Sequence, residues 1–303
     1  MADALMTSIR FLLFADLMLI LGLAVFPLYA FRGPHSAKAC AAADIAAVQP
    51  WLCGIGLIVS LVGMFALTAS MHGIDIVAVT PRMLLSMATE TDVGKAWIVR
   101  MLALGLAIIA SRQLGKRGAG ADIILSLAAA TALTTLVWSG HAAASDNLAG
   151  TIHRAADALH MIAAAIWIGA IAAFLIFLRP ATDDVEQPRF RMAAQSLERF
   201  AQVGTICVLA ITATGLINFE FIVGLRHADS MLGSTYGYLF IAKLLFFGGM
   251  LALAALNRWR LTPALAAADG EASCAAIRRS LAYETGAAVG ILAFVAMLGI
   301  LEP

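Results

Sequence analysis

Residues 11–31 read FLLFADLMLILGLAVFPLYAF, and Asp16 is the only charged side chain among them. A helix needs about 20 consecutive apolar residues to cross the roughly 30 Å hydrocarbon core of a bilayer. The stretch meets that length, and it is longer than the apolar segment of about 7–15 residues that marks a secretory signal peptide. We therefore predict a transmembrane helix that stays in the mature protein.

Similar stretches follow along the whole chain. With residues 9–30 they number about eight, the others being residues 51–71, 95–113, 121–141, 155–178, 200–224, 237–257 and 279–301. Hydrophobic residues make up 62% of the 303 residues and charged residues 13%. In a soluble domain the fractions are about half and about a quarter. No long polar segment separates the stretches, so we predict an all-α, polytopic membrane helix bundle that forms a single domain over residues 1–303.

The basic residues of the connecting segments predict the orientation of the bundle, because segments rich in Lys and Arg stay in the cytoplasm. The connections after the third, fifth and seventh predicted spans are rich in them: Arg112, Lys116, Arg117, Arg179, Arg189, Arg191, Arg199, Arg258, Arg260, Arg278 and Arg279. The alternate connections carry fewer: Arg82, Lys95, Arg154 and Arg226. Both termini are therefore predicted to face the periplasmic side.

This orientation places most of the histidines on that same side. Five of the six lie at or near the outer end of a predicted span: His72, His141, His153, His160 and His227. Met71 and Met161 are next to two of them in the sequence. Imidazole binds copper in either oxidation state and thioether selects copper(I), so the mixture favours a copper site. The alternative is that the histidines cap helix ends or pair with Asp157.

The densest group lies where the fifth predicted span begins. His153, Asp157 and His160 stand at i, i+4 and i+7, so they share one helical face. Two imidazoles with a carboxylate between them can bind a metal, or the carboxylate can orient a histidine that does. The candidate copper ligands are His72, His141, His153, His160, Met71, Met161 and Asp157.

Charged side chains inside the predicted spans form a second candidate feature. A charge in hydrocarbon costs several kcal/mol unless it is paired or hydrated, and such charges commonly line a pathway. We expect Asp16 or Glu220 to pair with Arg100 or Lys243, with snorkelling to the interface as the alternative for Lys243. Asn218 is a candidate for an interhelical hydrogen bond. These five residues are the candidate transport pathway.

Motifs for several enzyme classes are absent from the sequence. It has no Gly-x-x-x-x-Gly-Lys-Ser/Thr phosphate loop, no Gly-x-Ser-x-Gly nucleophile elbow and no His-Glu-x-x-His helix. We therefore expect no enzyme, and no coupling of transport to ATP by this chain alone. The four cysteines form no Cys-x-x-Cys pair, and the net charge of +1 does not suggest a nucleic-acid partner.

Several short stretches keep a characteristic order and spacing. They include Gly94-Lys95-Ala96-Trp97-Ile98-Val99-Arg100, Ser139-Gly140-His141-Ala142, Leu159-His160-Met161, Trp167-Ile168-Gly169 and Thr214-Gly215-Leu216-Ile217-Asn218, with Lys243, Asn257-Arg258 and Glu284 further on. Together they resemble the copper resistance protein D (CopD) family of bacterial membrane proteins, with a family-like core over about residues 90–303. The chain departs at Ala170, where the family often has a second glycine.

The resemblance implies a bacterial inner-membrane protein that takes copper(I) or copper(II) from the periplasm and moves it toward the cytoplasm. It also implies a periplasmic copper carrier of the CopC type as a partner, which must be a separate chain because no such domain is fused to the spans. Two other functions stay open. A b-type haem protein would use histidines of neighbouring helices as axial ligands for electron transfer. A docking or sensing partner of the carrier would not transport copper at all.

Overall fold

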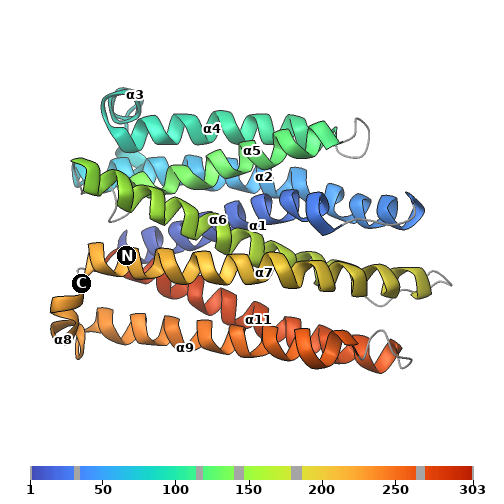
Figure 1. The fold of residues 1–303 in the computed structure, drawn as a ribbon. Coiled ribbons are helices and arrows are strands. Elements are labelled where there is room, and N and C mark those ends of the chain that lie inside the picture. The colour runs from blue at the N-terminus through green and yellow to red at the C-terminus, as the bar shows by residue number, and fades with distance from the viewer. Residues whose placement is uncertain are drawn as a thin grey trace.

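The computed structural model describes residues 2–30, 35–113, 119–139, 147–178, 186–263 and 270–301. This part of the chain contains helices and no strand, and eight of its helical segments are long and apolar enough to cross a membrane (Figure 1). The prediction of an all-α bundle with eight spans is therefore confirmed.

Successive spans cross the bundle in opposite directions. They are α1 (Ala2–Ala30), α2 (His35–His72), α4 (Asp92–Ser111), α5 (Ala119–Thr134) with the 3-10 turn η2 (Thr135–Ser139), α6 (Asn147–Phe177), α7 (Glu186–Ile222), α9 (Thr235–Leu256) with the π-helical turn η5 (Asn257–Leu261), and α11 (Gly270–Leu298). Short helices connect some of them: η1 (Ile76–Ala78), α3 (Pro81–Glu90), η4 (Leu225–His227) and α8 (Ala228–Met231). Figure 1 shows both termini at the end of the bundle that carries α3 and α8, which we call the terminal end. That this end is periplasmic stays a prediction.

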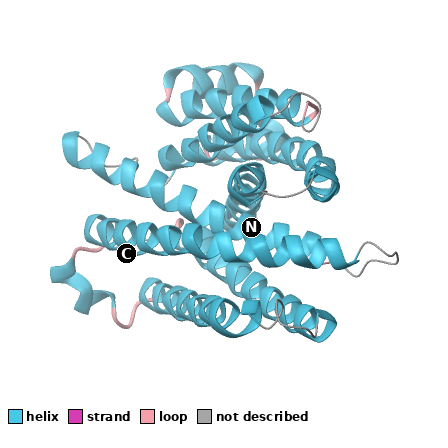
Figure 2. Cartoon of the chain, turned by 45° about the vertical axis from the view of Figure 1, so that its right-hand side comes forward, coloured by secondary structure: helices cyan, strands magenta, loops and turns pink. Residues whose placement is uncertain are grey.

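The first span packs against five other helices of the bundle. These are α2, α5, α6, α7 and α11, and the N-terminus lies near the middle of the bundle in Figure 2. Its closest neighbour is α6, because two glycines face each other there. A Cβ atom added to Gly22 would overlap the backbone of Ala165 and Gly169, and one added to Gly169 would overlap the backbone of Gly22. Small residues allow this close approach of helices in lipid, where apolar burial alone gives little attraction.

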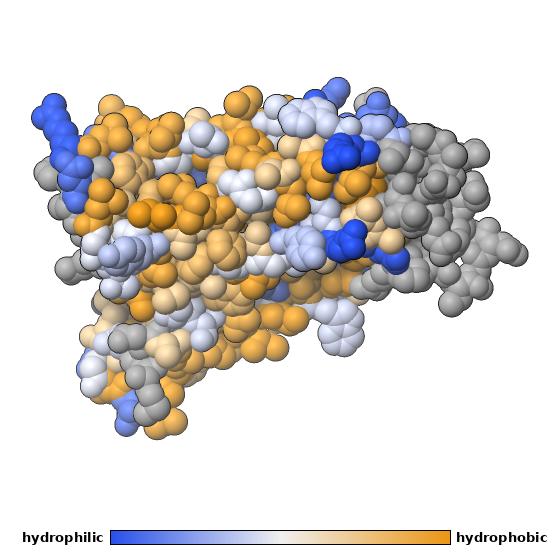
Figure 3. Space-filling view, turned by 90° about the horizontal axis from the view of Figure 1, so that it is seen from below, coloured by the Kyte–Doolittle hydropathy of each residue, from blue (hydrophilic) through white to orange (hydrophobic). Residues whose placement is uncertain are grey.

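The outer surface of the spans is apolar. Leu102, Leu209 and Leu245 expose 70%, 65% and 70% of their surface, and each lies within a span. On the face seen in Figure 3, hydrophobic residues cover the middle of the helices and strongly hydrophilic residues lie toward their ends. Such a continuous apolar surface is costly in water and favourable in lipid. The chain is a multi-pass membrane protein.

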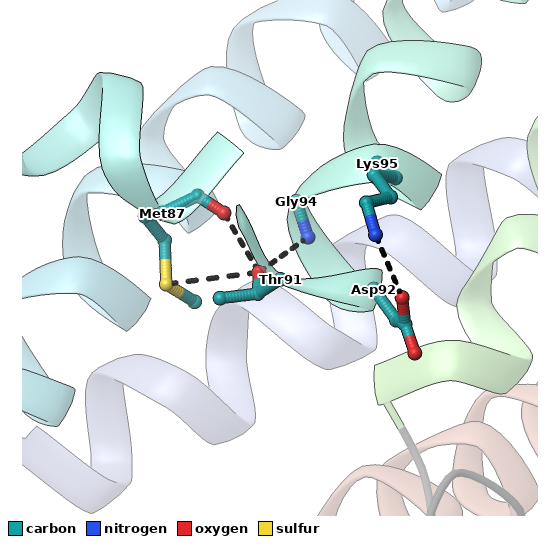
Figure 4. Close-up of polar contacts among 5 residues, drawn as sticks. All are labelled: Met87, Thr91, Asp92, Gly94 and Lys95. Atoms are coloured by element: carbon teal, nitrogen blue, oxygen red, sulfur yellow. Dashed lines mark hydrogen bonds and ion pairs between the residues drawn. The ribbon is translucent and has the colours of Figure 1, made fainter. Parts of the chain in front are cut away.

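Thr91 joins the short helix α3 to the span α4. Its hydroxyl oxygen accepts a 2.9 Å hydrogen bond from the backbone nitrogen of Gly94 and donates a 2.7 Å bond to the carbonyl oxygen of Met87 (Figure 4). Thr91 is thus the N-cap of α4 and also closes the last turn of α3. Gly94 is required beside it, because a Cβ atom there would overlap the backbone at Met87 and Ala88.

We predict that Thr91→Val lowers the free energy of unfolding by about 1 kcal/mol, because the N-cap hydrogen bond is lost while the side-chain volume is kept. Thr89→Val is the matched control. Its exposed hydroxyl bonds only to the Leu85 carbonyl of its own helix. Thermal unfolding in detergent measures both variants. Equal stabilities of the two would contradict the capping role.

Candidate functional site

Polar contacts join α6 to the antiparallel helix α7. His153 is buried, and its ring stacks on the ring of Phe221 with centroids 5.0 Å apart and planes 8° apart. One turn further along α6, the side-chain nitrogen of Asn218 donates a 3.3 Å hydrogen bond to Oδ1 of Asp157. Both residues of α6 therefore face α7, although they are separated by a full helical turn.

His160 makes the next contact with α7, and its hydrogen bond determines which ring nitrogen keeps a lone pair. Nδ1 of His160 lies 3.0 Å from Oγ1 of Thr214. The threonine hydroxyl has a single proton, which it donates to the carbonyl oxygen of Ala210 at 2.5 Å. Oγ1 is thus left as an acceptor, so we assign the proton of the neutral ring to Nδ1 and the lone pair to Nε2. An imidazole held through Nδ1–H is the form in which histidine binds metals in proteins.

Charged groups from two further helices complete this site. Asp157 interacts electrostatically with Arg10 of α1 and with Lys243 of α9, and Lys243 also acts on His160. Nη1 of Arg10 donates a 2.9 Å hydrogen bond to the carbonyl oxygen of Ser139. We call the resulting group the polar cluster; its members are Arg10, Asp157, His160, Thr214, Asn218 and Lys243.

The two histidines of α6 occupy different levels of the bundle. They are seven residues apart, which is about 10 Å along a helix. Each ring is held by a different residue of α7, His153 by Phe221 and His160 by Thr214. These contacts place the two rings at successive levels along α6, and a metal ion shared by them stays a prediction.

The other candidate ligands lie in varied surroundings. His72 is exposed, and its Nδ1 lies 2.9 Å from the carbonyl oxygen of Thr68 in its own helix. Met71 is 64% exposed beside it, whereas Met161 is 4% exposed and packs in the core. His141 lies outside the described residues. Within the described ranges, no group of three or more His, Cys, Asp or Glu side chains is placed to hold a metal, so the shared site stays a prediction.

Asp16 and Arg100 are buried between α1, α2 and α4, and the expected ion pair between them is not formed. No described side chain pairs with either charge. A Cβ atom on Gly56 would touch both the Asp16 carboxylate and Leu104, so Asp16 lies level with Leu104. Arg100 is one turn earlier on α4, and long side chains lean toward the N-terminus of their helix, which is away from Asp16.

The remaining pathway candidates divide into two kinds. Asn218 and Lys243 belong to the polar cluster. Glu220 is exposed near the end of α7, where its carboxylate accepts a 2.8 Å hydrogen bond from the backbone nitrogen of Leu225. This bond holds the turn that follows α7. Lys243 and Glu220 form no ion pair with each other or with Asp16 or Arg100 in the part of the chain that the structure describes.

The sequence-based set omitted two members of the polar cluster, Arg10 and Thr214. Arg10 directly precedes the first apolar stretch. A charged side chain at the end of a membrane span is stabilised by a partner of opposite charge, such as Asp157. Thr214 stands four residues before Asn218 and therefore lies on the same face of α7. Both signals were present in the sequence, but the partners come from distant segments.

Comparison with known proteins adds the following matches. Residues 1–151 match the family model described as copper resistance protein D-like, N-terminal domain, and residues 194–298 match the one described as copper resistance protein D. The chain is 36% identical over 312 residues to copper resistance protein D of Pseudomonas syringae pv. tomato, covering 100% of this chain and 98% of that protein. It is 24% identical over 302 residues to the inner membrane protein YebZ of Escherichia coli, covering 98% and 97%. It is 30% identical over 177 residues to the copper transport protein CutJ of Bacillus subtilis, covering 55% of this chain and 30% of CutJ.

Proposed function

The chain belongs to the copper resistance protein D family, and from this premise we propose that it binds periplasmic copper and moves it across the bacterial inner membrane toward the cytoplasm without using ATP. The observation that carries the proposal is the environment of His160. Its ring bonds to Thr214 and interacts electrostatically with Lys243, within a group of buried and partly buried polar side chains. Neutral imidazole is a ligand for copper in both oxidation states.

Copper would enter at the terminal end. Exposed Met71 and His72 there offer a thioether and an imidazole for its capture. His153 follows, because α6 begins at this end, and His160 lies two turns deeper on the same face. A separate carrier of the CopC type is the proposed donor, handing copper to these exposed groups. His141 is proposed as a further ligand near the entrance.

The charges of the polar cluster support transport rather than storage. Arg10 and Lys243 are basic side chains, and each interacts electrostatically with Asp157, the one acidic member of the cluster. A copper ion bound to His160 would therefore be attracted by Asp157 and repelled by Arg10 and Lys243. Passage through a membrane protein requires sites that bind strongly enough for entry and weakly enough for release. This mixed charge suits a position that copper occupies briefly.

Uptake into liposomes tests the proposal. Purified protein is reconstituted in vesicles that contain a copper-sensitive dye, and copper is added outside as copper(I) or copper(II), without nucleotide. We expect saturable uptake above that of empty vesicles for at least one oxidation state. Binding without uptake would instead favour a docking or sensing protein. A haem absorption spectrum in the purified protein would favour electron transfer.

A further inference from the structure

Glu284 is a buried carboxyl group on α11, 2% exposed and remote from the terminal end. Asn257, at the start of the π-helical turn η5, donates a 2.5 Å hydrogen bond from its side-chain nitrogen to Oε1 of Glu284. The indole of Trp167 on α6 lies beside the same carboxyl group. π-Helical turns are rare in proteins and often mark functional positions.

The surroundings of Glu284 contain polar groups but no charge that would hold it ionised. The side chains that act on it are Trp167 and Asn257, neither of which titrates, and no described Lys, Arg or His forms an ion pair with it. One turn away on α11 is the hydroxyl of Ser280. Two buried polar atoms of these neighbours make no hydrogen bond to a described residue: Oδ1 of Asn257 and Oγ of Ser280.

Asn257 suits both protonation states of this carboxyl group. Its amide nitrogen donates to a carboxylate, and after a half-turn of the amide its oxygen accepts from a carboxylic acid. An ionised Glu284 in low dielectric lacks a cation to offset the cost of its burial, so uptake of a proton removes that cost. We propose that Glu284, with Asn257 and Trp167, is a reversible proton-binding site in the half of the membrane opposite the terminal end.

An aromatic pair lies between this site and the polar cluster. Trp167 is two turns beyond His160 on α6, and Phe247 is one turn beyond Lys243 on α9. Their rings meet edge to face with centroids 6.1 Å apart. On this arrangement we expect Glu284 to exchange protons with the opposite end of the bundle, whereas the proposed entry of copper is at the terminal end. The inference goes beyond the proposed function, since proton binding here does not require copper.

Infrared difference spectroscopy of the full-length protein in lipid, recorded while the pH is raised, tests the inference. We expect the carbonyl band of a buried carboxylic acid to disappear as the pH rises. Glu284→Gln, which keeps the size of the side chain, should lack this band. Glu198→Gln, at an exposed carboxyl group of α7, should retain it. Asp16→Asn identifies any band that comes from Asp16, which is also buried.

A second variant covers the case in which Glu284→Gln fails to fold. Asn257→Leu removes the hydrogen bond but keeps the volume, and it should change the proton affinity of the group by about tenfold. The inference is overturned if the band persists in Glu284→Gln, if it does not respond to pH, or if Asn257→Leu leaves its titration unchanged. Failure of copper uptake by the wild-type protein would refute the proposed function and leave this result untouched.

Discussion

Copper affinity is expected to fall by about 100-fold or more when His160 is replaced by alanine, because the central ligand of the polar cluster is removed. Thr214→Val should have a smaller effect of about tenfold, because loss of a group that orients a ligating histidine typically costs about 10–100-fold in metal affinity. Without the Thr214 hydroxyl, the side-chain hydrogen bond at Nδ1 of His160 is lost. Competition with a copper chelator of known affinity measures all the variants.

Thr131→Val is the matched control for Thr214→Val. Thr131 is also a helical threonine that bonds to the carbonyl four residues earlier, but it is exposed on α5 and touches no member of the polar cluster. We expect its copper affinity to equal that of the wild-type protein. If Thr214→Val and Thr131→Val behave alike, the hydrogen bond to His160 does not prepare it for copper.

Gly169→Ala is expected to lower the free energy of unfolding by about 3 kcal/mol, the upper part of the range for overpacked sites. A Cβ atom at this position would meet the backbone of Gly22, which cannot rotate aside as a side chain would. The helices α1 and α6 would have to separate, and α1 also packs against four other helices. Thermal or denaturant unfolding in detergent measures the loss.

Gly248→Ala provides the comparison for this variant. Gly248 lies within α9, and a Cβ atom there would meet no other atom within 4 Å. Because alanine favours the helix more than glycine, we expect Gly248→Ala to be as stable as the wild-type protein or slightly more so. Equal stabilities of Gly169→Ala and Gly248→Ala would show that the close contact between α1 and α6 is not required.

The spans could be predicted from sequence because lipid imposes a simple rule. Each helix must present about 20 apolar residues to hydrocarbon, whatever its neighbours are. Which helix sits at the centre was not predictable in this way, because every span is apolar. The contact between Gly22 and Gly169 brings α1 close to α6. It joins residues far apart in the sequence, and a single sequence does not reveal such a pairing.

The candidate site was predictable where one helix carries it. The spacing of His153, Asp157 and His160 placed them on one face, and the structure finds contacts from all three to α7. The expected pair of Asp16 and Arg100 depended on the relative heights of two helices, and these differ by a turn. Charge patterns alone do not reveal such offsets.

X-ray absorption at the copper edge, recorded on the copper-loaded protein, shows whether His160 is a copper ligand. We expect scattering from imidazole nitrogen in the wild-type protein and a clear loss of that signal in His160→Ala. An identical spectrum in the two proteins, or wild-type protein that binds no copper when either copper(I) or copper(II) is added in excess, would contradict this role of His160.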